Sequence, residues 1–313
     1  MLFRNMENSD YHAVKEGADF SVSSSQLKDA LKSSRAFYKK YIAKTTPKEE
    51  SSAFDIGTAI HTSILEPEKF SNDIAIYEGI RNGAKWEKFK AENANKTIVI
   101  KSEIAKVLTA VAGYEKSEEA KKVRNAKGVE CELSCFLKLE VGPTQIYLPT
   151  PDGYYLLTKD GWVATDEVEE NRVSFTAKTR ADIINTVEGY IGDVKSTSED
   201  AQDVDDVLRA ISTFQYDMSA AYYLDIFAAQ ALLDWESLEA PQYFDWIFTS
   251  TNKESCAVYR STEPLLQAGR AKWRRAVLKI ANGFRTNWEG MEKEVITYVP
   301  VSKYDVHWLE EWK

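Results

Sequence analysis

Cysteines are few in this sequence of 313 residues, long apolar runs are absent, and positive charges are outnumbered by negative ones. The three cysteines, Cys131, Cys135 and Cys256, have a spacing that fits neither a disulfide framework nor a zinc or iron–sulfur site. We interpret them as small core residues. No apolar run reaches the roughly 18 residues of a membrane span, and Met1 to Asp10 lacks the apolar region of a secretory signal. These absences predict a cytoplasmic protein without a membrane partner.

Acidic residues outnumber basic ones by 49 to 40, which gives a formal net charge of −9. A protein that coats nucleic acid normally supplies clustered Lys and Arg, so this balance argues against binding through global electrostatics. Any contact with DNA must therefore be local. The hydrophobic fraction of 43% is sufficient for one large domain with a buried core.

The first 128 residues have mainly helical patterns. Ser23 to Gln26 has the form of a capping box, and apolar residues then recur at helical spacing, which predicts a helix over residues 24–41. A second helix should run from Phe54 to Leu65 and end there because Pro67 follows, which places His61 inside it. Further amphipathic helices are predicted over residues 83–93 and 102–117.

From Val129 onward, apolar and polar residues alternate, which predicts a strand with Glu132 on its polar face. Turn pairs and an acidic run then fill residues 142–174, a pattern typical of a hairpin excursion without catalytic residues. The remaining predicted elements are strands over 174–186 and 189–195 joined by a tight turn, a long helix over 204–235, paired strands over 243–250 and 255–261, and a helix over 264–287.

Two acidic residues and a lysine on the predicted hairpin 174–195 are the candidates for chemistry. Asp193 and Lys195 are two residues apart in a strand and therefore project to the same side, while Val194 turns into the core. The partner strand can bring Asp182 beside Asp193, and two carboxylates that close repel each other unless a divalent cation lies between them. Asp182, Asp193 and the backbone carbonyl of Val194 would form an oxygen-rich shell for Mg²⁺, for which Mn²⁺ would substitute. Lys195 would orient an attacking water or help to deprotonate it.

Each of these residues also has a simpler interpretation. An isolated Asp-x-Lys at a strand end is usually a surface ion pair. His61, on a mostly apolar helix, is by default a core histidine, and Glu132 is equally consistent with an exposed strand glutamate. The final helix has a basic row that fits a solvated face better than a phosphate-binding one; it comprises Arg270, Lys272, Arg274, Arg275 and Lys279 beside Trp273.

Several motifs occur in order along the chain: Asp10-Tyr11-His12, Ser23-Ser24-Ser25-Gln26-Leu27-Lys28, Gly57-Thr58-Ala59-Ile60-His61 followed by Leu65-Glu66-Pro67 and Phe70, Glu132-Leu133-Ser134, Arg180-Ala181-Asp182-Ile183 and Asp193-Val194-Lys195-Ser196-Thr197. Together they resemble the RecE-like (exodeoxyribonuclease VIII) branch of the PD-(D/E)XK nucleases over most of the chain. The resemblance implies an active site of His61, Asp182, Asp193 and Lys195, with His61 as a metal ligand. Glu132 is a secondary candidate for the catalytic set.

Two positions depart from the family pattern. Ala181 replaces the usual proline of an Arg-Pro-Asp motif, which should matter little. Ser219 stands where the family usually has a glutamine that helps to hold the DNA end or the active-site lysine, while Tyr223 of the same motif is retained. Gln215, one helical turn earlier, is a candidate substitute. Together with Arg180, these residues form the predicted set of DNA contacts.

The fold class predicted from the sequence is α/β, with the PD-(D/E)XK nuclease fold: a central mixed sheet flanked by helices. Residues 1–128 should form a helical portion that contributes His61 to the site, and residues 129–313 the nuclease core. We expect the two parts to make one composite domain.

The resemblance implies a Mg²⁺-dependent exonuclease that digests linear double-stranded DNA from its 5′ ends. The 3′ single strands left behind would serve a single-strand annealing protein of RecT type in phage-type recombination. The enzyme would be a homo-oligomeric ring in the cytoplasm, encoded by a phage or by its bacterial host cell. Two alternatives stay open. One is a RecB-like single-strand or structure-specific nuclease, although three scattered cysteines disfavour the iron–sulfur Cas4 version. The other is a catalytically silent DNA-binding protein with the same fold, which the loss of the glutamine at Ser219 makes conceivable.

Overall fold

The computed structural model describes residues 1–4, 6, 10–11, 20–47, 52–234 and 238–291. Its largest element is a mixed sheet whose strands follow the order β12 (Cys256–Arg260), β11 (Tyr243–Ser250), β10 (Tyr190–Thr197), β9 (Val173–Asn185), β5 (Val129–Val141), β6 (Ile146–Thr150), β7 (Gly153–Thr158) and β8 (Gly161–Thr165). Two short strands join it, β1 (Leu2–Phe3) antiparallel to β5 and β2 (Phe20–Val22) parallel to β9. The pairing of β10 with β11 is also parallel, whereas the other neighbours are antiparallel. The predicted α/β fold with a central mixed sheet is confirmed.

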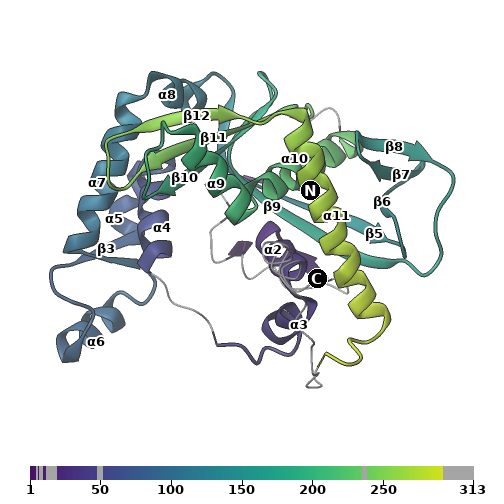
Figure 1. Ribbon diagram of the computed structural model, residues 1–313, viewed down its shortest axis with the longest axis horizontal. Coiled ribbons are helices and arrows are strands. Elements are labelled where there is room, and N and C mark those ends of the chain that lie inside the picture. Colours follow the sequence, from purple (N-terminus) through teal and green to yellow (C-terminus); the bar gives the residue numbers. More distant parts are fainter. Residues whose placement is uncertain (5, 7–9, 12–19, 48–51, 235–237, 292–313) are drawn as a thin grey trace, which may run out of the picture.

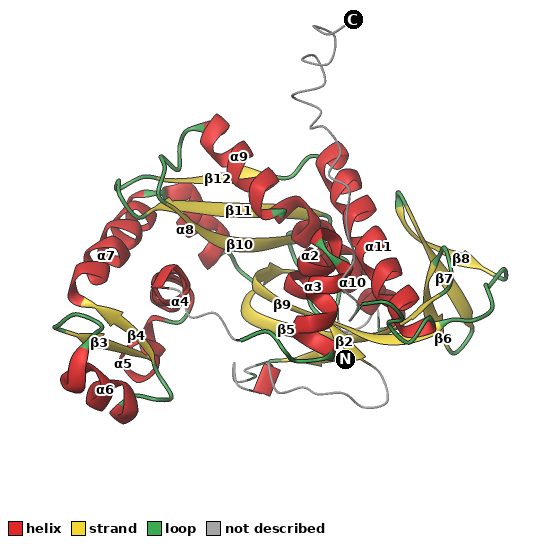
Figure 2. Ribbon diagram, turned by 60° about the horizontal axis from the view of Figure 1, so that its bottom comes forward, coloured by secondary structure: helices red, strands yellow, loops and turns green. Residues whose placement is uncertain are grey.

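Helices cover both faces of the central strands (Figures 1 and 2). The larger core cluster joins the sheet to α2 (Ser24–Lys32), α10 (Tyr216–Leu233) and α11 (Glu263–Arg285), and it includes Ile191 of β10. The second cluster joins the sheet to α4 (Ser52–Leu65) and α7 (Lys101–Lys116), and it includes Val194 of β10. Because alternate residues of a strand face opposite sides, β10 is buried between the two helical layers.

The remaining elements extend from this centre. Residues 142–174 form the predicted excursion, with β6, β7 and β8 at one end of the molecule (Figure 1). A small parallel sheet pairs β3 (Ile74–Tyr77) with β4 (Thr97–Ile100) near α4 and α7. The other helical segments are α3 (Ser34–Phe37), the π-helix η1 (Tyr38–Ile42), the 3-10 helix η2 (Pro67–Lys69), α5 (Phe70–Asp73), α6 (Gly83–Glu92), α8 (Glu118–Asn125) and α9 (Val204–Phe214). The described part of the first 128 residues, expected to be helical, thus also supplies four short strands.

Two predicted helices are interrupted, and both predictions of continuity were wrong. The helix expected over residues 24–41 ends at Lys32, because Ser33 is extended with φ −157° and its hydroxyl caps the next helix at the amide of Ala36. The helix expected over residues 204–235 breaks at Gln215, which has the left-handed conformation with φ 52° and ψ 47°. Residue 235, the predicted end of that helix, lies outside the described residues.

The cysteines agree with the sequence interpretation in being free. Cys135 and Cys256 are buried, while Cys131 is only partly buried. Among the described residues, no helix is both long and apolar enough to cross a membrane.

Candidate metal centre and active site

The candidate site forms where β9 and β10 stop pairing. Their backbone register runs from Tyr190 opposite Asn185 to Gly192 opposite Ile183, and Asp193 and Asp182 come directly after the last pair. Beyond that point a side chain replaces the partner strand, because the amide of Val194 donates to Asp182 Oδ2 at 2.8 Å. The divergence of the strands therefore brings two carboxylates to one place, and one of them satisfies the Val194 amide that no longer faces a partner strand.

Asp193 and Lys195 project from the same side of β10, as the strand period predicts. Lys195 Nζ lies 2.6 Å from Asp193 Oδ2, and Val194 between them is fully buried under α4. Burial alone would lower the pKa of Lys195, but the carboxylates of Asp193 and Asp182 outweigh it and raise this pKa. Burial raises the pKa of Asp193, and the neighbouring Asp182 adds to the rise while Lys195 opposes it. The lysine is thus held as an ammonium ion.

His61 reaches the same place from α4, which packs against β10 (Figure 2). Its Nε2 lies 2.6 Å from the carbonyl oxygen of Val194. A carbonyl can only accept, so Nε2 carries the hydrogen and, in the neutral ring, Nδ1 keeps its lone pair. That Nδ1 faces Asp182 Oδ2 at 3.4 Å. Two acceptors that close require a proton or a cation between them.

Glu132 completes the group from β5. It stands opposite Asp182, since the flanking pairs are Cys131 with Ile183 and Leu133 with Ala181. Its φ of 54° is unusual for a residue inside a strand. Burial, together with the Asp182 carboxylate, raises the pKa of Glu132 to about 8.

His61, Glu132 and Asp182, hereafter the ligand cluster, each offer one ligand atom within 4.8 Å of the others. Two carboxylate oxygens and an imidazole nitrogen with a free lone pair suit a divalent cation. This donor set differs from the one expected from the sequence. Asp193 is held by Lys195 instead of joining the cluster, and the Val194 carbonyl, expected as a ligand, accepts the hydrogen bond that orients His61.

The predicted DNA-contacting residues are dispersed around this centre. Arg180 pairs with Glu132 at 2.7 Å between Nε and Oε2, so its guanidinium positions the ligand cluster. Gln215 has a buried Oε1 without a hydrogen-bond partner among the described residues. Tyr223 is bonded to the Ser24 side chain, and burial raises the pKa of its phenol. Ser219 is partly buried on α10, and nothing in its surroundings assigns it a role.

From the sequence, no role near the site was assigned to three residues that lie there, Tyr216, Phe214 and Lys28. Tyr216, the first residue of α10, has its ring centroid 5.1 Å from Lys195 Nζ and 5.0 Å from Lys28 Nζ. Phe214 stacks against the same ring, with centroids 5.6 Å apart and an interplanar angle of 29°. The capping box at Ser23 fixed where α2 begins, but no local signal showed which of its residues would face β10.

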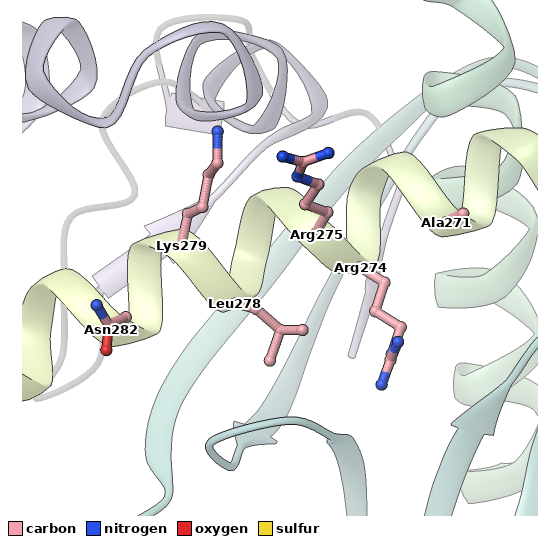
Figure 3. Close-up of a pocket in the computed structure, with 6 residues that line it drawn as sticks. All are labelled: Ala271, Arg274, Arg275, Leu278, Lys279 and Asn282. Atoms are coloured by element: carbon pink, nitrogen blue, oxygen red, sulfur yellow. The ribbon is translucent and has the colours of Figure 1, made fainter.

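The basic row of α11 divides into buried and surface residues. The expected solvated face was wrong for Arg270, which is 8% exposed and bonded to Asp225, and Trp273 beside it is fully buried. Figure 3 shows Arg275 and Lys279 on one side of α11 and Arg274 on the other. They line a surface hollow together with Ala271, Leu278 and Asn282. Lys279 and Arg274 donate to the backbone carbonyls of Leu31 and Thr144, so part of their hydrogen-bonding capacity is already used within the protein.

Comparisons with known proteins agree with this geometry. Residues 23–282 match the model of a family described as a PDDEXK-like domain of unknown function (DUF3799). The crystal structure of a "putative exonuclease" from Eubacterium rectale is similar over 97% of this chain and 98% of that one, with a TM-score of 0.54 and 13% identity. A second solved structure, that of SSO0001, covers 90% of this chain and 86% of its own with a TM-score of 0.34 and 11% identity, and it adds nothing to the assignment. No curated protein matches the sequence.

Proposed function

Because the chain belongs to the family of PDDEXK-like domains, we propose that it is a nuclease that requires a divalent metal ion and hydrolyses phosphodiester bonds of DNA. The observation that carries this proposal is the meeting of the ligand cluster with the Asp193–Lys195 ion pair where β9 and β10 diverge. In finer terms, we propose a Mg²⁺-dependent exonuclease that acts on the ends of linear double-stranded DNA in the 5′→3′ direction. The name of the similar Eubacterium rectale protein supports an exonuclease, and the motif resemblance supports the direction.

The residues of the ligand cluster would hold the metal ion. When bound, such an ion neutralises charge on the phosphate and lowers the pKa of a coordinated water. The chain itself keeps His61 in the correct tautomer through Val194 and keeps Glu132 in place through Arg180. These contacts fix the ligand atoms before substrate arrives.

Lys195 would act as a cation and hydrogen-bond donor. Its raised pKa means that the side chain stays protonated at neutral pH in the metal-free protein. An ammonium ion in this position orients a water molecule and stabilises negative charge on a phosphate oxygen, whereas it cannot accept a proton. In the metal-free protein this side chain is thus arranged to orient a water molecule, which is one of the two roles that the sequence left open.

The test is degradation of a linear duplex labelled separately at its 5′ and 3′ ends, with Mg²⁺ or with a chelator. Lys195→Ala should reduce the rate by about 10²–10⁴-fold, because a positioned charge and proton donor is lost. Lys88→Ala is the matched control, since this exposed lysine belongs to the remote helix α6. Metal-dependent loss of the 5′ label first, abolished only by the Lys195 substitution, is the expected result.

Other outcomes identify the alternatives. Degradation of single strands in preference to duplex ends would favour a RecB-like nuclease. DNA binding without degradation at any divalent metal would favour a silent DNA-binding scaffold. A homo-oligomeric ring and a single-strand annealing partner are further proposals from the motif resemblance, and light scattering of the purified protein tests the first.

A further inference from the structure

The break between α9 and α10 places an aromatic pair beside the reaction centre. Gln215 adopts a left-handed conformation that costs a non-glycine residue energy, and such strain often persists at functional sites. The break allows Phe214 and Tyr216, on its two sides, to stack on each other. Tyr216 in turn lies under Lys195. A strained helix junction thus connects the protein surface to the candidate active site.

Phe214 is the exposed member of this pair. It is 56% exposed, whereas Tyr216 is only partly exposed. Large aromatic side chains are usually more buried, and an exposed ring supported from behind by a second ring is a suitable surface for a nucleobase. The buried Oε1 of Gln215, without a hydrogen-bond partner among the described residues, adds an unused acceptor at the same junction.

Lys28 supplies positive charge at the same ring. Its Nζ lies 5.0 Å from the Tyr216 centroid, next to the ring's contact with Lys195. Lys195 has Asp193 as its counter-ion, but no carboxylate of the described residues forms an ion pair with Lys28. Burial, and then the neighbouring Lys195, lower the pKa of Lys28 to about 8, although Asp193 and Asp217 act in the opposite direction. Two ammonium groups therefore lie beside one ring, and of the two only Lys195 forms an ion pair among the described residues.

We propose that Lys28 and Phe214 form a nucleotide subsite for the DNA strand that enters the active site. Lys28 holds a backbone phosphate next to the one that reacts, and Phe214 stacks on the base of the same nucleotide. Both residues contact Tyr216, since Lys28 Nζ lies 5.0 Å and the Phe214 ring centroid 5.6 Å from the centroid of that ring, so one bound strand can meet both. The inference rests on the proposed nuclease function and deepens it, because it names two contacts with the substrate.

The phosphate contact is tested with Lys28→Met. The full-length protein is titrated with a short fluorescein-labelled duplex that has a single-stranded end, with Ca²⁺ in place of Mg²⁺, at several salt concentrations. Loss of one phosphate contact should weaken binding about tenfold. It should also reduce the slope of log affinity against log salt by about 0.7–0.9. Lys28→Arg should restore both, and Lys32→Met, on an exposed residue one turn later in α2, should change neither.

The base contact is tested with Phe214→Ala and a duplex whose single-stranded end carries 2-aminopurine. Stacking on Phe214 should quench this base, and the variant should lose the quenching and about fivefold or more in affinity. The salt slope should stay unchanged, because no charge is removed. Leu208→Ala is the control, since Leu208 is 51% exposed on the same helix α9.

The outcomes separate this inference from the proposed function. A wild type that degrades DNA while Lys28→Met and Phe214→Ala bind like their controls overturns the subsite alone. A wild type that binds DNA with the expected dependence on both residues but never degrades it overturns the nuclease proposal alone. Unchanged melting temperatures and unchanged Mn²⁺ binding in both variants exclude a general effect on folding or on the ligand cluster.

Discussion

Replacing Glu132 by glutamine should stabilise the metal-free protein, and the gain should grow as the pH rises. The carboxyl group of Glu132 lies opposite Asp182, and burial together with this neighbour raises its pKa from 4.5 to about 8. Between these two values the unfolded chain is ionised at this residue while the native protein binds a proton. The native state therefore becomes less stable with rising pH across that window, and glutamine removes the effect.

The magnitude follows from the slope of about 1.4 kcal/mol per pH unit for one proton. Between about pH 5.5 and pH 7.5 the full slope would amount to about 2.7 kcal/mol. The glutamate side chain is 20% exposed and is paired with Arg180, and both features reduce the penalty. We expect the stability difference between Glu132→Gln and the wild type to increase by about 1–2 kcal/mol over this interval.

Urea denaturation in the presence of a chelator measures this difference at the two pH values. Glu130→Gln, on the same strand but outside the ligand cluster, controls for the general effect of removing a negative charge. The reasoning would be refuted if the free energies of unfolding of the wild type and of Glu132→Gln changed in parallel with pH. The Glu132 carboxyl group would then titrate alike in the folded and unfolded states.

The same pair of proteins also tests the metal site. Addition of Mn²⁺ should raise the midpoint of unfolding of the wild type, because a cation that binds only the native state stabilises it. The rise should be much smaller in Glu132→Gln, which keeps the shape of the side chain and loses its negative charge. An equal rise in both proteins would place the cation elsewhere.

Three further predictions concern other contacts of the structure. Asp225→Ala should destabilise the protein by about 3–5 kcal/mol because the buried Arg270 loses its counter-ion. In urea denaturation, replacing both Asp225 and Arg270 should cost less stability than the sum of the two single replacements. Gly269→Ala should lower the melting temperature, since the added methyl group would lie 2.1 Å from the backbone oxygen of Asp217 and separate α10 from α11. His61→Ala should reduce Mn²⁺ affinity in calorimetry by at least about tenfold, and unchanged binding would exclude His61 from the ligand cluster.

The sequence predicted those features of the site that follow from local periodicity. The two-residue period of a strand placed Asp193 and Lys195 on one side and Val194 in the core, and the structure shows this arrangement. The turn between β9 and β10 likewise predicted that Asp182 would lie near Asp193. Such predictions succeed because, once the strand register is set, the hydrogen-bonded ladder fixes the side of the sheet to which each side chain points.

Features that depend on tertiary contact were not available from the local pattern. Only the motif resemblance suggested that His61, which lies on a mostly apolar helix, would contact residues of β9 and β10. Glycine and asparagine are the residues that usually adopt the left-handed conformation, but here the residue is Gln215. No signal in the sequence therefore indicated the helix break, and the aromatic pair beside it was missed. The interruption at Ser33 had a signal, because two consecutive serines offer a helix cap, but the apolar spacing beyond them favoured a continuous helix.

The backbone of Val194 explains why two strands and one helix of the site are coupled to each other. Its amide donates to Asp182 and its carbonyl accepts from His61, so one residue of β10 connects a carboxylate of β9 to an imidazole of α4. Both backbone groups are available because β9 has diverged and the ladder no longer uses them. A slip of one residue in the β9–β10 register would exchange Val194 for a neighbour and turn Asp193 and Lys195 into the core. The register therefore sets the tautomer of His61, the direction of Asp182 and the exposure of Lys195 together.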